Sequence, residues 1–203
     1  MNTTDIIMNL LIFGITTILL IRFSRKDGVW TTEKLKVALR YFTCQSNVFC
    51  AATALVTAVS LLVAGNSTVP RWVWTLKYIG TAGVTITMLT VFLYLWPLLG
   101  KDGFRRLFSG PDFFLHLVTP LLAILSFCLP EKQGMTFPQS LWGLMPLVFY
   151  GPLYIYRILY APEGKRWDDF YGFNRQGKWP LAYAMMFAGT FCICMLFLLA
   201  QNS

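Results

Sequence analysis

Long hydrophobic runs are the feature that most restricts how this chain can fold. Six of them can be read along the sequence, at residues 6–23, 37–64, 73–99, 111–129, 138–160 and 180–200. Each is close to the roughly 20 apolar residues that a helix needs to cross a bilayer. The alternation of apolar and polar residues is too weak for an outer-membrane barrel. We therefore predict an all-α integral membrane protein with six transmembrane helices in one domain, residues 1–203.

The charges predict an orientation for these helices. Only 13% of the 203 residues are charged, about half the fraction of an ordinary soluble domain. Of the 17 lysines and arginines, all but Arg71, Lys77 and Lys132 fall in or beside the first, third and fifth loops. By the positive-inside rule these loops face the cytoplasm and both termini face outward. The net charge of +8 then reflects orientation and does not indicate a nucleic-acid partner.

The N-terminal run is expected to be a retained first helix. Asp5 precedes it and Arg22, Arg25 and Lys26 follow it, which reverses the charge order of a secretory signal. All five cysteines lie inside apolar runs without metal-ligand spacing, so we interpret them as packing residues and expect no metal and no cofactor. Gly80 and Gly83 offer small surfaces for close helix packing.

The fifth loop, residues 161–179, is unusually aromatic for a solvated linker. We expect it to fold back on the inner face of the helices as a cap. An ordinary interfacial anchor remains an open alternative.

A polar cluster opens the second hydrophobic run. Thr43, Gln45, Ser46 and Asn47 carry hydrogen-bonding side chains at a depth where such groups are costly unless they meet partners or line a cavity. Such a cluster indicates a functional site. Thr43 lies six residues into its run, and the only histidine, His116, lies five residues into the fourth run. With about 1.5 Å rise per residue, both are expected roughly 8–9 Å below their helix starts, on the same side of the membrane.

A hydroxyl and an imidazole at one depth predict nucleophilic catalysis. Histidine is the usual base that removes a hydroxyl proton during attack. Asn47, with Ser46 beside it, lies on the face of Thr43 and could donate to an oxyanion. Asp112, one turn before His116, could orient the imidazole. Arg40, three residues before Thr43, could bind a carboxylate or phosphate head group.

Each of these assignments has a structural alternative. His116 could bond to a neighbouring helix, and Thr43 to its own backbone one turn back. Gln45, Ser46 and Asn47 could join helices, Asp112 could be a helix N-terminal acid, and Arg40 could be an interfacial anchor. A thiol nucleophile at Cys44 also stays open.

Three motifs resemble the androgen-induced and androgen-dependent TFPI-regulating membrane proteins and their bacterial Pr6Pr-type relatives. They are residues 41–47 (YFTCQSN), His116 with residues 118–122 (VTPLL), and residues 171–174 (YGFN). The resemblance implies an intramembrane threonine hydrolase acting on lipid esters, such as fatty acid esters of hydroxy fatty acids, with Thr43 and His116 in the catalytic roles. The fifth loop is closer to the bacterial members, which implies a bacterial inner-membrane location. A related branch transfers acyl chains, so a membrane acyltransferase stays open.

The sequence thus predicts a lipid-ester hydrolase without cofactor, whose partners are its lipid substrate and the membrane. A transporter or lipid-binding protein that holds a ligand without reacting is the main alternative, because intramembrane polar residues also mark such pathways.

Overall fold

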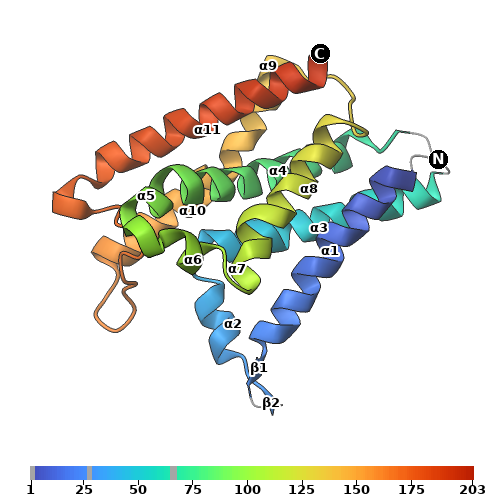
Figure 1. The fold of residues 1–203 in the computed structure, drawn as a ribbon. Coiled ribbons are helices and arrows are strands. Elements are labelled where there is room, and N and C mark those ends of the chain that lie inside the picture. Colours follow the sequence, from blue (N-terminus) through green and yellow to red (C-terminus); the bar gives the residue numbers. More distant parts are fainter. Residues whose placement is uncertain (1–2, 27–28, 65–67) are drawn as a thin grey trace.

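The computed structural model describes residues 3–26, 29–64 and 68–203, and it is built almost entirely of helices (Figure 1). The elements in chain order are α1 Thr3–Phe23, β1 Arg25–Lys26, β2 Val29–Trp30, α2 Glu33–Ala38, α3 Phe42–Val63, α4 Arg71–Thr90, η1 Val91–Leu95, α5 Trp96–Leu99, η2 Gly100–Asp102, α6 Gly103–Leu107, α7 Pro111–Phe113, η3 Phe114–Val118, α8 Thr119–Cys128, α9 Phe137–Ser140, η4 Leu141–Leu144, α10 Met145–Ile155, η5 Tyr156–Tyr160, η6 Arg175–Gly177 and α11 Trp179–Asn202. The two short strands pair antiparallel.

Five helices among the described residues are long and apolar enough to cross a membrane: Thr3–Phe23, Phe42–Val63, Arg71–Leu99, Pro111–Cys128 and Trp179–Asn202. This is consistent with the predicted all-α membrane protein. The remaining predicted span, 138–160, is helical too, but the tighter 3-10 segment η4 interrupts it. The α-helices on either side of η4 are each too short to cross a membrane as one continuous helix.

The predicted start of the second span is wrong. The sequence indicated residue 37, whereas α3 begins at Phe42, after the separate short helix α2. Tyr41 precedes α3 in an extended conformation (φ −85°, ψ 135°), which separates the two helices. Thr43 consequently lies in the first turn of its helix and not two turns inside it.

Prolines reshape two of the long helices. Proline lacks the N–H that a helical turn needs, and π-helical turns are one way in which a helix adapts. Before Pro97, the Trp96 N–H bonds to the Val91 carbonyl, five residues back. Before Pro120, the Thr119 N–H bonds in the same way to the Phe114 carbonyl. Both turns leave the helix continuous, but they change which backbone carbonyl groups accept a hydrogen bond within it.

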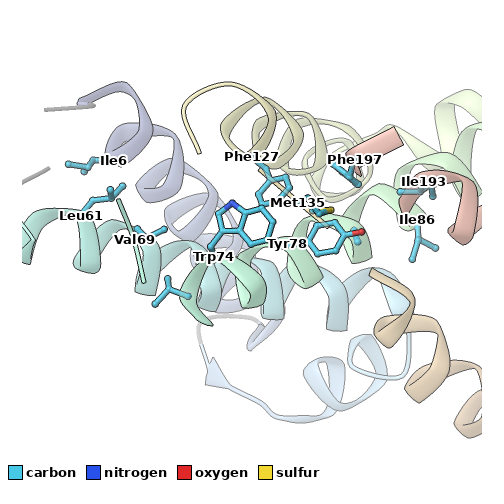
Figure 2. Close-up of a cluster of buried hydrophobic side chains, with 12 residues drawn as sticks. Ile6, Leu61, Val69, Trp74, Tyr78, Ile86, Phe127, Met135, Ile193 and Phe197 are labelled. Carbon is cyan, nitrogen blue, oxygen red and sulfur yellow. The ribbon is translucent and has the colours of Figure 1, made fainter. Parts of the chain in front are cut away.

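Helix α4 is the central element, since most of its residues from Val73 to Thr87 are buried. Its Trp74 and Tyr78 pack with Phe127 of α8 and with Phe197 of α11 (Figure 2). Gly80 permits close approach to α3, because a Cβ there would lie 2.8 Å from Thr53 Oγ1 and 3.0 Å from Cys50 Cα. This confirms the expected close packing at Gly80.

The fifth loop folds back onto the helices, as predicted for a cap. Phe170 packs on Tyr41, just before α3, with ring centroids 4.3 Å apart. Tyr154 of α10 contacts the rings of Trp167, Phe170, Tyr171 and Phe173. The loop is thus an extension of the core at this end of the molecule.

One carboxylate shapes this loop. Asp169 accepts hydrogen bonds from the Tyr154 hydroxyl (2.9 Å) and from the backbone N–H groups of Phe173 (2.8 Å) and Asn174 (2.7 Å). Hydrogen bonds to an ionised group are worth roughly 1.5–3 kcal/mol each. Asp169 therefore determines where the 171–174 segment lies.

We expect Asp169→Ala to release the loop from the helices, because three donors lose their acceptor. Trypsin should then cleave at Arg175 and Lys178 faster than in the unmodified protein, on the order of tenfold for each 1.4 kcal/mol of local stability lost. The matched control is Asp168→Ala, which removes the neighbouring exposed acid. Equal cleavage rates for the two variants would contradict the role of Asp169.

Candidate functional site

An apolar cavity of about 400 Å³ lies between α3, α4 with η1, α10, α11 and the fifth loop. This volume is in the range of about 300–1,000 Å³ that small-molecule sites occupy. Its walls are mainly apolar, with Ile86, Leu147 and Met186 among them. Two further lining residues, Leu93 and Met185, are 74% and 67% exposed. The cavity is therefore accessible from the outer surface of the helices, where a membrane-embedded chain faces lipid.

Thr43 lines this cavity at the N-terminus of α3, together with Phe42, Thr87 and Thr90. The first N–H groups of a helix have no partner inside the helix. Here the Tyr171 hydroxyl oxygen takes that place, because it accepts a hydrogen bond from the Phe42 N–H (3.0 Å) and is also hydrogen-bonded to Thr43. The loop residue Tyr171 thus caps α3 at the point where Thr43 meets the cavity.

The Tyr171 phenol remains protonated at all physiological pH values. Burial raises its pKa to about 12, although hydrogen bonds from Phe42, Tyr150 and Thr43 act in the opposite direction. A protonated phenol is a hydrogen-bond donor as well as an acceptor. The site therefore contains one neutral donor next to the Thr43 hydroxyl, at the polar end of an otherwise apolar cavity.

His116 lies on η3, the π-helical turn before Pro120, and its side chain is buried (8% exposed). Its Nδ1 is 2.7 Å from the Leu107 carbonyl oxygen. A carbonyl can only accept, so Nδ1 carries the proton and Nε2 of the neutral ring keeps its lone pair. Such an arrangement prepares Nε2 to act as a base.

Asn47 joins the helix of Thr43 to the turn of His116. Its side-chain nitrogen donates to the Thr43 carbonyl (2.8 Å) and to the Leu115 carbonyl (3.1 Å). Leu115 needs this donor because the Thr119 N–H is bound to Phe114 and the next candidate, Pro120, has no N–H. The Asn47 side-chain nitrogen therefore links the backbone at residue 43 to the backbone at residue 115.

The other predicted residues have mainly structural contacts. The Ser46 hydroxyl bonds to the Thr43 carbonyl and to Thr87 Oγ1, and Gln45 donates to the Leu39 carbonyl. Arg40 is exposed, and its backbone carbonyl accepts from the Tyr150 hydroxyl. Asp112 interacts electrostatically with His116, but the bond that orients the imidazole goes to Leu107. Cys44 is buried.

Asn47 thus connects the backbone at Thr43 with the backbone beside His116. The depth expected for Thr43 is wrong, because it assumed a helix start at residue 37 and Thr43 lies in the first turn of α3. His116 is not among the residues that line the cavity, and no hydrogen bond in the described part of the chain joins it to the Thr43 side chain. Asn47 uses its amide nitrogen on two carbonyls, so its predicted role as an oxyanion donor would require one of these bonds to break. Tyr171 is the better placed donor.

Sequence reasoning missed two participants. The Leu107 carbonyl has no signature in the sequence, because every residue carries a carbonyl group. Tyr171 belongs to the YGFN motif at residues 171–174, in which the sequence alone predicts no site residue. Its position among aromatic residues of the fifth loop was the available signal.

Comparisons of the chain with protein-family models, with curated proteins and with solved structures found no significant match. Within the described residues, no group of three or more histidine, cysteine, aspartate or glutamate side chains could hold a metal ion.

We expect Asn47→Ala to destabilise the protein by roughly 1–2 kcal/mol, because it leaves the Leu115 carbonyl without a donor inside the helix bundle. Thermal unfolding of the purified protein in detergent would measure this as a lower Tm. Gln45→Ala is the matched control, since it removes a neighbouring amide whose bond goes to the exposed edge at Leu39. An unchanged Tm for Asn47→Ala would contradict the bridging role.

Proposed function

We propose that this protein is an intramembrane lipid-ester hydrolase in which Thr43 is the nucleophile and His116 the base. The observation that carries the proposal is the position of Thr43, at a helix N-terminus on the wall of an apolar cavity that is accessible from the lipid-facing surface. An acyl chain matches the apolar walls, and its ester carbonyl would then lie at the polar end of the cavity.

The convergence of the three resembling motifs supports this function. Tyr171 caps the helix that carries Thr43, although 128 residues separate them. Asn47 connects the same helix to the backbone beside His116. The three segments that carry the resemblance are therefore neighbours in the fold, as a hydrolase of that family would require.

The chemistry can be written with these groups alone. The Thr43 oxygen bonds to the ester carbonyl carbon as its proton passes to His116 Nε2, directly or through one water. The Tyr171 hydroxyl donates to the carbonyl oxygen while that oxygen carries negative charge. The bond to the alcohol then breaks, the alcohol takes the proton from His116, and an acyl ester of Thr43 remains. Water adds by the same route and releases the fatty acid; an alcohol in place of water would give acyl transfer.

We further propose six membrane crossings, with both termini outside, in a bacterial inner membrane. Gln133, between the fourth and fifth spans, donates through its backbone to Gln201 near the C-terminus. Asn9 near the N-terminus bonds to Glu131 of the same connection. Both ends of the chain therefore lie at one end of the bundle (Figure 1), as an even number of crossings requires. The helical segments between residues 137 and 160 supply the sixth crossing.

Lipid binding without reaction is the second candidate, because His116 does not line the cavity that Thr43 lines. In that case the cavity would hold a lipid chain and the threonine would only hydrogen-bond to its head group. The two candidates differ in one respect that can be measured, since only the hydrolase forms an acyl ester at Thr43.

We expect Thr43→Ala and His116→Ala each to lower ester turnover by on the order of a hundredfold or more, since each removes a group that acts in the transition state. Labelling of the purified protein by a lipid-like fluorophosphonate should disappear with Thr43→Ala. Thr90→Ala is the matched control, because it removes another hydroxyl from the same cavity.

The outcomes separate the candidates. Labelling that maps to Thr43 and survives in Thr90→Ala supports the hydrolase. Equal turnover in all variants and no adduct, together with saturable binding of a fluorescent fatty acid, would exclude the hydrolase in favour of lipid binding.

A further inference from the structure

A second polar centre lies at the opposite end of the helix bundle from the fifth loop, near the termini (Figure 1). Four residues form it: Asp5 and Asn9 of α1, Lys77 of α4, and Glu131 of the segment after α8. Their exposed fractions are 2%, 0%, 0% and 4%. None of them belongs to the site of Thr43.

Asn9 is hydrogen-bonded to the other three residues of this centre. Its amide nitrogen lies 2.8 Å from Asp5 Oδ1 and 2.9 Å from Glu131 Oε1. Its amide oxygen accepts from the Lys77 ammonium group, which also lies 3.5 Å from Glu131 Oε1. The Trp74 indole N–H donates to the Glu131 backbone carbonyl and fixes the segment.

The charges of this centre do not balance if every group is ionised. Two carboxylates face one ammonium group, which leaves one buried negative charge, and buried charges are stable only when paired. Among the residues that the structure describes, the other titratable neighbours do not supply the missing positive charge: Cys50 of α3 and Cys128 of α8 are thiols, and Lys132 is exposed.

Two further observations identify what balances the charge. Glu131 Oε2 is fully buried and has no donor among the described residues. The Asp5 and Glu131 carboxyl groups are neighbours, because Asp5 Oδ1 and Glu131 Oε1 both accept from the same Asn9 amide nitrogen. A carboxylate oxygen can only accept, so a hydrogen bond between the two carboxyl groups requires a proton on one of them.

We propose that Asp5 and Glu131 form a proton-binding site, in which one shared proton bridges the two carboxyl groups at neutral pH. The ligand is the proton itself. With the proton bound, the centre consists of one neutral acid, one carboxylate and the Lys77 ammonium, and its net charge is zero. The centre joins α1, α4 and the end of α8, so loss of the proton loosens this junction.

The proton can be detected directly by infrared spectroscopy of the full-length protein in lipid nanodiscs. A protonated carboxyl group has a carbonyl stretching band separate from the amide bands, and the band shifts in D2O. We expect this band at neutral pH in the unmodified protein and its loss in Asp5→Asn and in Glu131→Gln. Asp168→Asn, which changes an exposed acid, is the control that should keep it.

Asp5→Asn is the decisive variant, because it retains a neutral charge balance between Glu131 and Lys77 and supplies an amide N–H in place of the acid proton. It should therefore fold even if Glu131→Gln does not. Absence of the band in the unmodified protein at neutral pH, or its persistence in folded Asp5→Asn, would overturn the proposal. Absence of the band combined with a Tm that rises with sodium concentration would replace the proton by a metal cation.

Stability supplies an independent readout. The folded protein retains a proton that ordinary carboxyl groups release above about pH 5, so the folded state binds more protons than the unfolded state. Tm should then fall as the pH rises from about 5 to about 9, and this fall should be smaller in Asp5→Asn. Equal slopes in the two proteins would contradict a shared proton.

Discussion

One amide side chain, that of Asn47, joins two helices of this molecule beside the cavity. In an environment without water, every backbone polar group needs a partner from the protein. The proline at position 120 and the π-helical turn before it leave the Leu115 carbonyl without a helical donor. Asn47 supplies that donor and at the same time binds the Thr43 carbonyl. The backbone hydrogen bond that is missing in one helix is thus replaced by a side-chain hydrogen bond from another helix.

The same defect determines the position of the only histidine. His116 lies within the π-helical turn, and its Nδ1 is bonded to the Leu107 carbonyl at the end of α6. Serine hydrolases obtain this orientation from a carboxylate, whereas here a backbone carbonyl provides it. The carbonyl fixes the tautomer, and it stabilises a developing positive charge on the ring less than a carboxylate would. Together with the capping of α3 by Tyr171, this makes the cavity end of the bundle a defined polar region inside an apolar fold.

The sequence predicted well the features that depend on hydrophobicity, such as the positions of the long helices. It predicted poorly the features that depend on single contacts. The long apolar runs predicted the five membrane-length helices among the described residues. The common depth predicted for Thr43 and His116 rested on a helix start at residue 37, whereas Thr43 lies in the first turn of α3. The start of α3 was placed five residues too early, because residues 37–41 are mostly apolar although the chain is extended at Tyr41.

The second polar centre could not be read from the sequence for a different reason. Lys77 was assigned to the outer side by charge counting and Asp5 to orientation, yet both are buried partners of Asn9 and Glu131. These four residues are spread over 127 positions, so only the packing of α8 against both α1 and α4 brings them together. An isolated charge near the end of a hydrophobic run is compatible with either a surface anchor or a buried network.

The state of the His116 ring tests the central claim most directly. The chain contains one histidine, so nitrogen-15 NMR of histidine-labelled protein in nanodiscs gives the signals of this ring alone. Our account predicts that the neutral ring carries its proton on Nδ1, bound to Leu107, and has an unprotonated Nε2. A proton on Nε2 in the neutral ring would contradict it, because His116 could then not accept the proton of Thr43.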